Sequence, residues 1–281
     1  MRSKSLQIGS IVVILLLSGC SGLLGGQPSS PEMTDRTDGA PTETPTTTPS
    51  NSVRLAPGLT EHGVEKPFVL ATAHSNVLEN RSYTVRSRHV ERYANGTLRT
   101  RAVSVTRVAA NDSYYYTTNT TGVVPGFGDA RHVRLTIWSN GTDRFRALTV
   151  DQNTTYDRVS QVFRSDLTNS QRLSTLFVAL NTTVTEKIVH ENGTTRYRVK
   201  STGVGVPDSL ATIEGVDSMS NVSFTALIAP NGVVYEYTLS YTATLDGKTI
   251  NVTQEVKFDE VGETTVDRPT WVDEAGQVNQ S

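Results

Sequence analysis

Two adjacent segments near the C-terminus alternate between apolar and polar side chains, and this period of two constrains the fold more than any other feature. In VYEYTLSYTATL, residues 234–245, every second residue from Tyr235 onward is apolar, and INVTQEVKF, residues 250–258, resumes the pattern. Successive side chains of a β-strand point to opposite faces. Asp246-Gly247 between the segments suits a tight turn. The pair therefore predicts an antiparallel hairpin with one buried and one solvated face.

The same combination of alternation and turn recurs along the chain. Asn231-Gly232 precedes the hairpin and extends it to a three-strand meander. Further hairpins are predicted around Asn95-Gly96, Asn140-Gly141 and Asn192-Gly193, and SYYYTT follows the first of them as a third strand. Together these signals predict an antiparallel sheet of about nine to eleven strands.

Helical periodicity is confined to short segments. PFVLATAHSNVLE, residues 67–79, places Phe68, Leu70, Ala71, Val77 and Leu78 on one side, with Pro67 in the first turn. SQRLSTLFVAL, residues 170–180, has apolar residues at helical spacing, with Asn169 or Ser170 as N-cap. A third short helix is predicted over 208–213. Few helices against many meandering strands indicate an α+β fold, a strongly curved antiparallel sheet with two or three helices on one face.

The chain has one cysteine, Cys20, which follows an apolar run. Arg2 and Lys4 precede a mainly apolar stretch of ten residues, 8–17, shorter than the roughly 20 that a membrane-spanning helix needs. Leu17-Ser18-Gly19-Cys20 resembles the lipobox of lipoprotein signal peptides, in which the cysteine is lipidated and becomes the first residue of the mature chain. We therefore expect a signal peptide over 1–19 and attachment to membrane lipid through Cys20, at the outer face of the cell membrane. An ordinary secretory signal with a chance cysteine is the alternative.

Composition divides the rest of the chain. Residues 20–57 are rich in Thr, Pro, Ser and Gly and have little to bury, which predicts a disordered tether. We expect a single domain over 58–277 and a disordered tail over 278–281. Removing Arg2 and Lys4 from the 26 basic residues leaves 24 against 28 acidic ones, a net charge of −4. This balance gives no basic footprint for nucleic acid.

Asparagines occur mostly in N-glycosylation sequons. Eleven of the fifteen begin Asn-x-Ser/Thr, and turn chemistry explains only some of this excess. We expect several to carry glycans. The candidates are Asn80, Asn95, Asn111, Asn119, Asn140, Asn153, Asn181, Asn192, Asn221 and Asn251, and the eleventh sequon, Asn279, lies in the tail.

Motifs for catalysis, metals or cofactors are not evident in the sequence. The five histidines have no ligand spacing, and His74 is best interpreted as a partly buried helix residue. GVVPGFGDARH, residues 122–132, is interpreted as a mobile loop at the rim of the sheet. In the run 114–116, only Tyr114 and Tyr116 can share a face, and packing is favoured over binding for them. The arginines of the first hairpin are interpreted as a solvated face instead of an anion site: Arg86, Arg88, Arg92, Arg99, Arg101 and Arg107. We expect no enzyme activity, metal or cofactor.

Short motifs and the order of elements carry a resemblance that spans the mature chain. The residues concerned are Leu17-Ser18-Gly19-Cys20, the Thr/Pro tether, Ser82-Tyr83-Thr84-Val85, Ala94-Asn95-Gly96-Thr97, and Pro269-Thr270-Trp271-Val272-Asp273-Glu274-Ala275. They resemble haloarchaeal surface lipoproteins of unknown function, and the element order resembles the lipoprotein-carrier architecture of LolA, LppX and RseB. That architecture implies an open half-barrel with helices on its concave face, and a cavity for acyl chains or lipoproteins.

Two functions follow as hypotheses. The first is a non-catalytic, membrane-anchored module that binds a hydrophobic ligand, a lipid or a lipoprotein, in a half-barrel cavity. The alternative is a structural, sensor or interaction glycoprotein of the cell envelope, with a protein partner and no small-molecule ligand.

Overall fold

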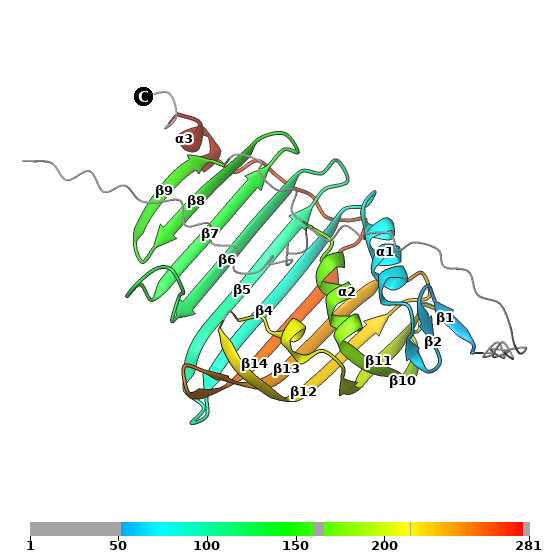
Figure 1. Cartoon of the computed structure of the whole chain (residues 1–281). Helices are drawn as coiled ribbons and strands as arrows, with labels where there is room; N and C mark the ends of the chain where they lie inside the picture. The colour runs from blue at the N-terminus through cyan, green and yellow to red at the C-terminus, as the bar shows by residue number, and fades with distance from the viewer. Residues whose placement is uncertain (1–51, 160–165, 214, 278–281) are drawn as a thin grey trace, which may run out of the picture.

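The fold is an open, curved antiparallel sheet of eleven strands (Figure 1). In this computed structural model, the described residues are 52–159, 166–213 and 215–277. The strand order is β10-β11-β12-β13-β14-β4-β5-β6-β7-β8-β9, so β9 and β10 form the two edges and the sheet does not close into a barrel. The strands are β4 Tyr83–Tyr93, β5 Leu98–Val108, β6 Tyr114–Gly122, β7 His132–Ser139, β8 Arg144–Val150, β9 Asn153–Arg158, β10 Leu180–Val189, β11 Thr195–Val204, β12 Val216–Ile228, β13 Val234–Leu245 and β14 Lys248–Asp259.

Every hairpin predicted from an Asn-Gly or Asp-Gly pair is present, and the strand number lies at the top of the predicted range. Tyr237 pairs with Val256 and Tyr241 with Val252, so the alternating apolar residues of β13 and β14 share one face. These residues belong to the main hydrophobic core, while Glu255 and Lys257 point the other way. The α+β fold class predicted from periodicity is confirmed.

Helices α1 (Pro67–Leu78) and α2 (Ser170–Ala179) lie on the concave face, over β4 and β11 to β14 (Figure 1). Phe177 of α2 meets Phe224 of β12 edge to face, with ring centroids 5.6 Å apart. The imidazole of His74 meets Phe258 of β14 in the same way at 4.7 Å. Leu70 of α1 is fully buried in the same core. The helices therefore supply the second layer that the sheet needs to bury its apolar face.

Two details of the helices differ from prediction. Asn169 occupies the N-cap position of α2 but makes no side-chain cap hydrogen bond. Asp166 caps the helix instead, because its carboxylate accepts a hydrogen bond from the backbone N–H of Gln171 at 2.8 Å. Phe68, predicted on the buried side of α1, is 68% exposed. Its Cβ direction places it beyond the buried stripe of Leu70, Ala71, His74 and Leu78.

A small sheet that the sequence pattern did not predict precedes α1. It comprises β1 (Arg54–Ala56), β2 (Leu59–Thr60) and β3 (Gly63–Val64). Strand β1 therefore lies on the N-terminal side of the expected domain boundary at residue 58. The backbone N–H of Val64 donates to Thr182 Oγ1 at 2.9 Å, so the small sheet packs beside edge strand β10.

The remaining helices are short. The segment predicted as a third helix over 208–213 forms a single 3₁₀ turn, η1 (Pro207–Leu210). An unpredicted helix, α3 (Trp271–Gln277), packs against β8 and β9. The rings of Trp271 and Tyr156 stack at 6.1 Å, and the strand register places Tyr156 on the face opposite to that of α1 and α2. Two helices thus lie on the concave face and one on the convex face.

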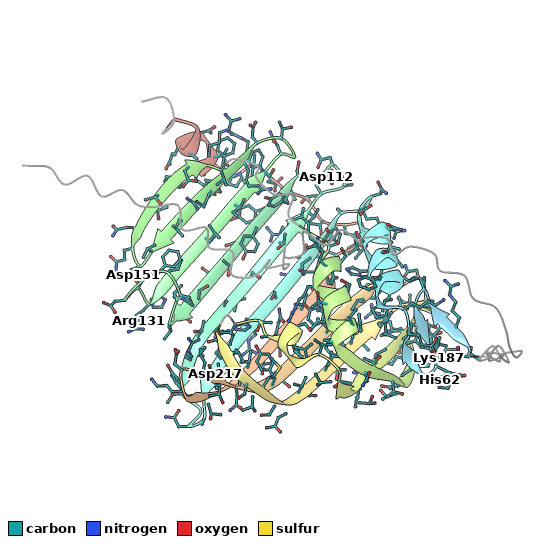
Figure 2. All side chains as sticks on the ribbon, in the orientation of Figure 1. His62, Asp112, Arg131, Asp151, Lys187 and Asp217 are labelled. Carbon is teal, nitrogen blue, oxygen red and sulfur yellow. The ribbon has the colours of Figure 1, made fainter. Side chains whose placement is uncertain are left out.

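The glycine-containing loop between β6 and β7 is folded against the sheet. Val124 and Ala130 are buried with Val133 in a separate small apolar cluster, contrary to the prediction of a mobile loop. The backbone N–H of Arg131 donates to Asp151 Oδ1 at 3.2 Å, and Figure 2 shows the two residues together at this end of the sheet.

Several predictions concern residues outside the described ranges. The signal peptide, Cys20, most of the tether, the tail and Asn279 belong to this group. Within the described part of the chain, no helix is long and apolar enough to cross a membrane.

Candidate functional site

The concave face is filled on the side that α1 and α2 cover. Leu173, Leu176 and Phe177 of α2 pack with Tyr237 and Leu239 of β13 in one continuous core. Burial raises the pKa of Tyr237 to about 12. The Arg172 guanidinium donates to the carbonyl oxygens of Ser209 and Leu210, which ties α2 to η1. This half of the face is a packed interior and not an empty groove.

Beyond the helices, the same face continues over β6, β7 and β8 (Figure 1). The register places Tyr116 beside Ile137, and Leu135 beside Leu148. All four side chains are only half-buried. They form an apolar region on the concave side, which we call the β7–β8 region.

A polar strip lies beside this region on the same face, and Tyr116 and Ile137 also pack against the main core. Across β14, β4, β5 and β6, the register aligns Gln254 with His89 and aligns Ser87 with Ser104 and Thr118. Val85 and Phe258, which belong to the core, share this face. The strip consists of Gln254, Ser87, His89, Glu91, Thr100, Ser104 and Thr118.

Within the strip, Glu91 contacts two basic side chains. His89 Nε2 lies 2.9 Å from Glu91 Oε1, and Arg99 contacts the other carboxylate oxygen. Burial opposes the ionisation of Glu91, but the hydrogen bonds and charges of His89 and Arg99 outweigh it and hold the pKa of the carboxyl below its usual value. Because an ionised carboxylate can only accept, His89 Nε2 carries the proton.

Two side-chain atoms of the strip are buried without a hydrogen-bond partner: His89 Nδ1 and Gln254 Oε1. His89 is 5% and Gln254 7% exposed. Gln254 Oε1 is an acceptor, and His89 Nδ1 is a ring nitrogen that makes no hydrogen bond. Buried polar atoms without partners are costly, so the strip is suited to water or to a polar ligand group.

Two surface hollows occur on the helix layer. One, of about 400 Å³, is bordered by β3, the start of α1, the end of α2 and β10. The other, of about 240 Å³, is lined by Phe68 and Ser75 of α1 and by Gln171 and Ser174 of α2. Neither is lined by residues of the polar strip or of the β7–β8 region.

Comparison with known families gives a match to a family of unknown function, DUF7537, over residues 6–275. The chain belongs to this family. No protein of curated function matches the DUF7537 chain.

Solved structures that resemble the DUF7537 chain do so distantly. LprF from Mycobacterium bovis is 11% identical with a TM-score of 0.40, covering 73% of this chain and 96% of its own. A DUF1329 family protein from Desulfovibrio piger is 11% identical with a TM-score of 0.28, covering 75% and 97%. A domain named for outer membrane lipoprotein sorting, from Vibrio parahaemolyticus, is 10% identical with a TM-score of 0.26, covering 76% and 98%. Similarity at this level assigns no function to the DUF7537 chain.

The histidines singled out in the sequence have different environments. His74 is fully buried, where Nε2 donates to the carbonyl oxygen of Thr168 at 2.9 Å and Nδ1 accepts from the backbone N–H of Val234 at 3.1 Å. His62, His132 and His190 are exposed. Among residues 52–159, 166–213 and 215–277, no three His, Cys, Asp or Glu side chains are placed to hold a metal ion.

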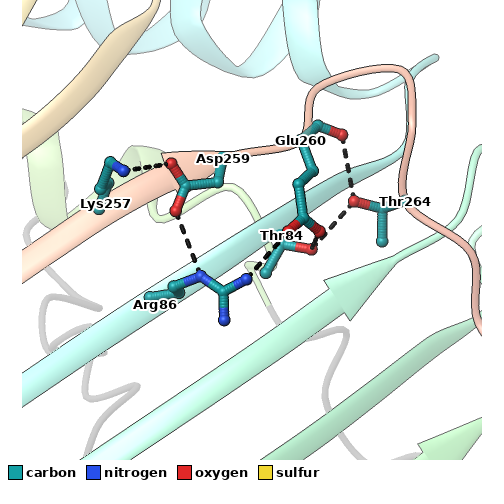
Figure 3. Close-up of polar contacts among 6 residues, drawn as sticks. All are labelled: Thr84, Arg86, Lys257, Asp259, Glu260 and Thr264. Carbon is teal, nitrogen blue, oxygen red and sulfur yellow. Dashed lines mark hydrogen bonds and ion pairs between the residues drawn. The ribbon is translucent and has the colours of Figure 1, made fainter.

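The arginines of the first hairpin lie mostly on the convex face, where acidic residues of β14 pair with two of them. Arg86 bonds to Asp259 at 3.2 Å and to Glu260 at 3.0 Å, and Thr84 and Thr264 complete the network (Figure 3). Arg88 pairs with Glu255 at 3.2 Å. Arg99 differs, because a register shift between Glu91 and Arg92 accompanies its contact with the buried carboxylate of Glu91 on the concave side.

All ten sequon asparagines within the described residues are exposed. Asn95 and Asn192 lie in turns, where each Oδ1 accepts from the backbone N–H two residues later. Asn153 and Asn181 lie instead on the edge strands β9 and β10. The structure therefore leaves these sequons accessible.

The sequence pattern did not predict the polar strip. The available signal was Gln254, a polar residue at a position where the alternation of β14 expects an apolar one. His89 and Glu91 form the corresponding pair on β4.

Proposed function

We propose that this protein is a membrane-anchored, extracytoplasmic lipoprotein whose domain binds an amphiphilic ligand, such as a lipid, on its concave face without catalysing a reaction. The observation that supports it best is the pairing of two unlike surfaces on one face. The half-buried β7–β8 region adjoins a strip with two unpaired buried polar atoms, His89 Nδ1 and Gln254 Oε1. An apolar chain suits the first surface and a hydrogen-bonding head group suits the second.

The anchor in this proposal is Cys20. The ten-residue apolar run before it is too short to span a bilayer, which needs about 20 residues. One acyl chain gives only marginal membrane binding, so the proposal requires a lipid with two chains on the sulfur. Residues 1–19 are then a cleaved signal peptide, and the Thr/Pro-rich segment that follows is the tether between the anchor and the domain.

The binding proposal concerns the uncovered half of the face. Among the described residues, the helix-covered half is occupied by the protein's own side chains, so the ligand is proposed to lie over the half-buried β7–β8 region with its head group toward the strip. Leu135, Ile137 and Leu148 offer apolar contact area. Burial of such area favours binding by about 25 cal/mol per Å².

Native mass spectrometry of the protein purified from its own membranes tests this function. We expect co-purified lipid with the natural chain, and several-fold less with Leu135→Gln, because the added amide must lose its hydration to meet an acyl chain. Val103→Gln is the matched control, since Val103 lies on β5 and pairs with Arg88 on the convex face. Absence of co-purified lipid from the natural chain, or equal loss in both variants, would contradict the proposal.

A second function is favoured by the accessibility of the sequons. An envelope glycoprotein that acts through a protein partner needs exposed acceptor sites, and all ten described ones are exposed. Crosslinking in intact cells distinguishes the two functions. A stable protein neighbour without lipid cargo supports the second, and lipid cargo without a neighbour supports the first.

A further inference from the structure

Helix α1 has an exposed face without charge. Residues 67–78 contain no Asp, Glu, Lys or Arg. One side buries Leu70 and Leu78 in the core, while on the other side Phe68 is 68% and Val69 45% exposed. Exposed helix faces are ordinarily polar or charged. The exposed side of α1 is uncharged: Thr72 and Asn76 are its exposed polar residues, and the first turn exposes two large apolar side chains.

Helix α2 adds to this apolar surface. Val178, near the end of α2, is 49% exposed. It borders the same hollow as Pro67 at the start of α1, and Phe68 borders the neighbouring hollow with Ser174 of α2. The helices run in opposite directions, so the start of α1 meets the end of α2 (Figure 1). We call Pro67, Phe68, Val69 and Val178 the helix-end patch.

The chain enters the folded domain beside this patch. The small sheet β1–β3 joins the preceding residues to α1, and the backbone N–H groups of Glu65 and Lys66 both donate to the carbonyl oxygen of Gly58. Figure 2 shows His62, which borders the same hollow as Pro67, at the outer side of the small sheet. An anchor upstream of residue 52 is therefore connected to the end of the domain that bears the patch.

The length of the segment between Cys20 and the domain limits the distance between the domain and the bilayer. Cys20 and Arg54 are 34 residues apart in the sequence. A flexible coil of this length has an average end-to-end distance of roughly 30 Å. Tethering at such a distance raises the effective concentration of bilayer at the domain surface, so that even a small apolar patch suffices for contact.

We propose that the helix-end patch rests on the lipid bilayer to which the chain is anchored. This inference depends on the anchoring through Cys20 proposed above. Phe68, Val69 and Val178 leave water when they enter the interface between head groups and acyl chains. The face carries no charged side chain of α1 that must lose its hydration. The contact orients the domain, with the small sheet and the helix layer toward the membrane.

The test uses the full-length anchored protein with one dye at a time. Because Cys20 is acylated in this proposal, a cysteine introduced by Phe68→Cys or Val178→Cys is the only free thiol and takes a polarity-sensitive fluorophore. Leu98→Cys is the matched control: Leu98 is also apolar and 42% exposed, but it lies at the opposite end of β4 from α1. The protein is reconstituted in phosphatidylcholine and phosphatidylglycerol vesicles that contain a nitroxide-labelled lipid.

We expect the nitroxide to quench the dyes at positions 68 and 178 several-fold more than the dye at position 98. Adding Phe68→Ser to the chain labelled at 178 should reduce its quenching toward the control level. Equal quenching of all three dyes on vesicle-bound protein would overturn the patch contact and leave the anchor intact. Dye shielding at positions 68 and 178 that increases with protein density and is independent of the nitroxide would assign the patch to a second copy instead. Labelling of the natural chain at Cys20, with no vesicle binding, would overturn both proposals.

Discussion

At the scale of single residues, the buried ionisable groups have the clearest roles. His74 and the Glu91 group are both buried, but one is neutral and the other pairs opposite charges. His74 links α1 to residue 168 and to the start of β13 through two backbone hydrogen bonds. Burial lowers its pKa from 6.5 to about 4 against the smaller opposing effects of Thr168 and Asp166. A second proton, which would charge the imidazole of His74, is thus disfavoured in the folded state above about pH 4.

This lowered pKa predicts a pH dependence of stability. Between pH 6.5 and 4 the unfolded chain binds a proton that the folded chain does not, so the free energy of unfolding decreases as the pH falls. The difference corresponds to about 3 kcal/mol. Urea unfolding across this range should show a flatter pH dependence for His74→Gln than for the natural chain. Exposed His62→Gln should keep the natural slope, and equal slopes for all three proteins would contradict the prediction.

The buried charge group predicts a second difference. Glu91→Gln leaves Arg99 in the interior without its carboxylate, and loss of one partner of a buried pair costs about 3–5 kcal/mol. Glu255→Gln removes the partner of Arg88, but both side chains of that pair are nearly half exposed, so the cost should stay below about 1 kcal/mol. Denaturant unfolding at pH 7 measures both. A similar loss of unfolding free energy in the two variants would show that Glu91 is not the counter-charge of Arg99.

At the scale of elements, strands were easier to predict than the segments that pack on them. The alternation of β13 and β14 and their Asp-Gly turn are local signals, and both strands form as predicted. The small sheet β1–β3 has strands of two or three residues, too short to show a period. Helix α3 has only seven residues, and contacts of Trp271 with distant Tyr156 stabilise it.

Gly63 determines how the small sheet meets β10. It has φ +130°, and a Cβ there would lie 2.1 Å from the carbonyl oxygen of Thr182. Gly63→Ala should therefore displace β3 and reduce the free energy of unfolding by about 3 kcal/mol. Gly96→Ala is the control, since Gly96 also has positive φ but nothing lies within 4 Å of its Cβ position, so about 1 kcal/mol is expected. Urea unfolding measures both losses of free energy. Equal losses in the two variants would mean that the close approach of residue 63 to Thr182 does not contribute to the effect of the substitution.

At the scale of the whole molecule, the open sheet has two edges that the chain must protect. Unpaired edge strands promote pairing between molecules. The small sheet packs beside β10, and α3 contacts β9. Each edge strand also carries an exposed sequon, Asn181 on β10 and Asn153 on β9.

We predict that glycans at these two positions prevent the edge strands of different molecules from pairing. Replacing Asn153 and Asn181 by Gln in the protein from its own cells should increase self-association, measured by light scattering. Replacing Asn95 and Asn192, which lie in hairpin turns, removes the same number of sequons and should not. Peptide mass spectrometry that found Asn153 and Asn181 unmodified would contradict the prediction.

Anchoring is the other property of the whole molecule. Cys20→Ser should move the protein from the membrane fraction to the soluble fraction, because the apolar run before Cys20 is too short to hold the chain. Ser21→Ala leaves the sulfur in place and should remain in the membrane fraction. Mass spectrometry of the mature N-terminal peptide identifies the lipid. Continued membrane attachment of Cys20→Ser would disprove the anchor.

The sequence by itself determined the strand pattern, the turns, both longer helices and the α+β class, because each depends on side chains only a few residues apart. Tertiary structure alone decided the polar strip, since Gln254 and His89 meet only when β14 pairs with β4. It also decided that Phe68 faces water. These outcomes depend on contacts between segments far apart in the chain, and local periodicity carries no information about them.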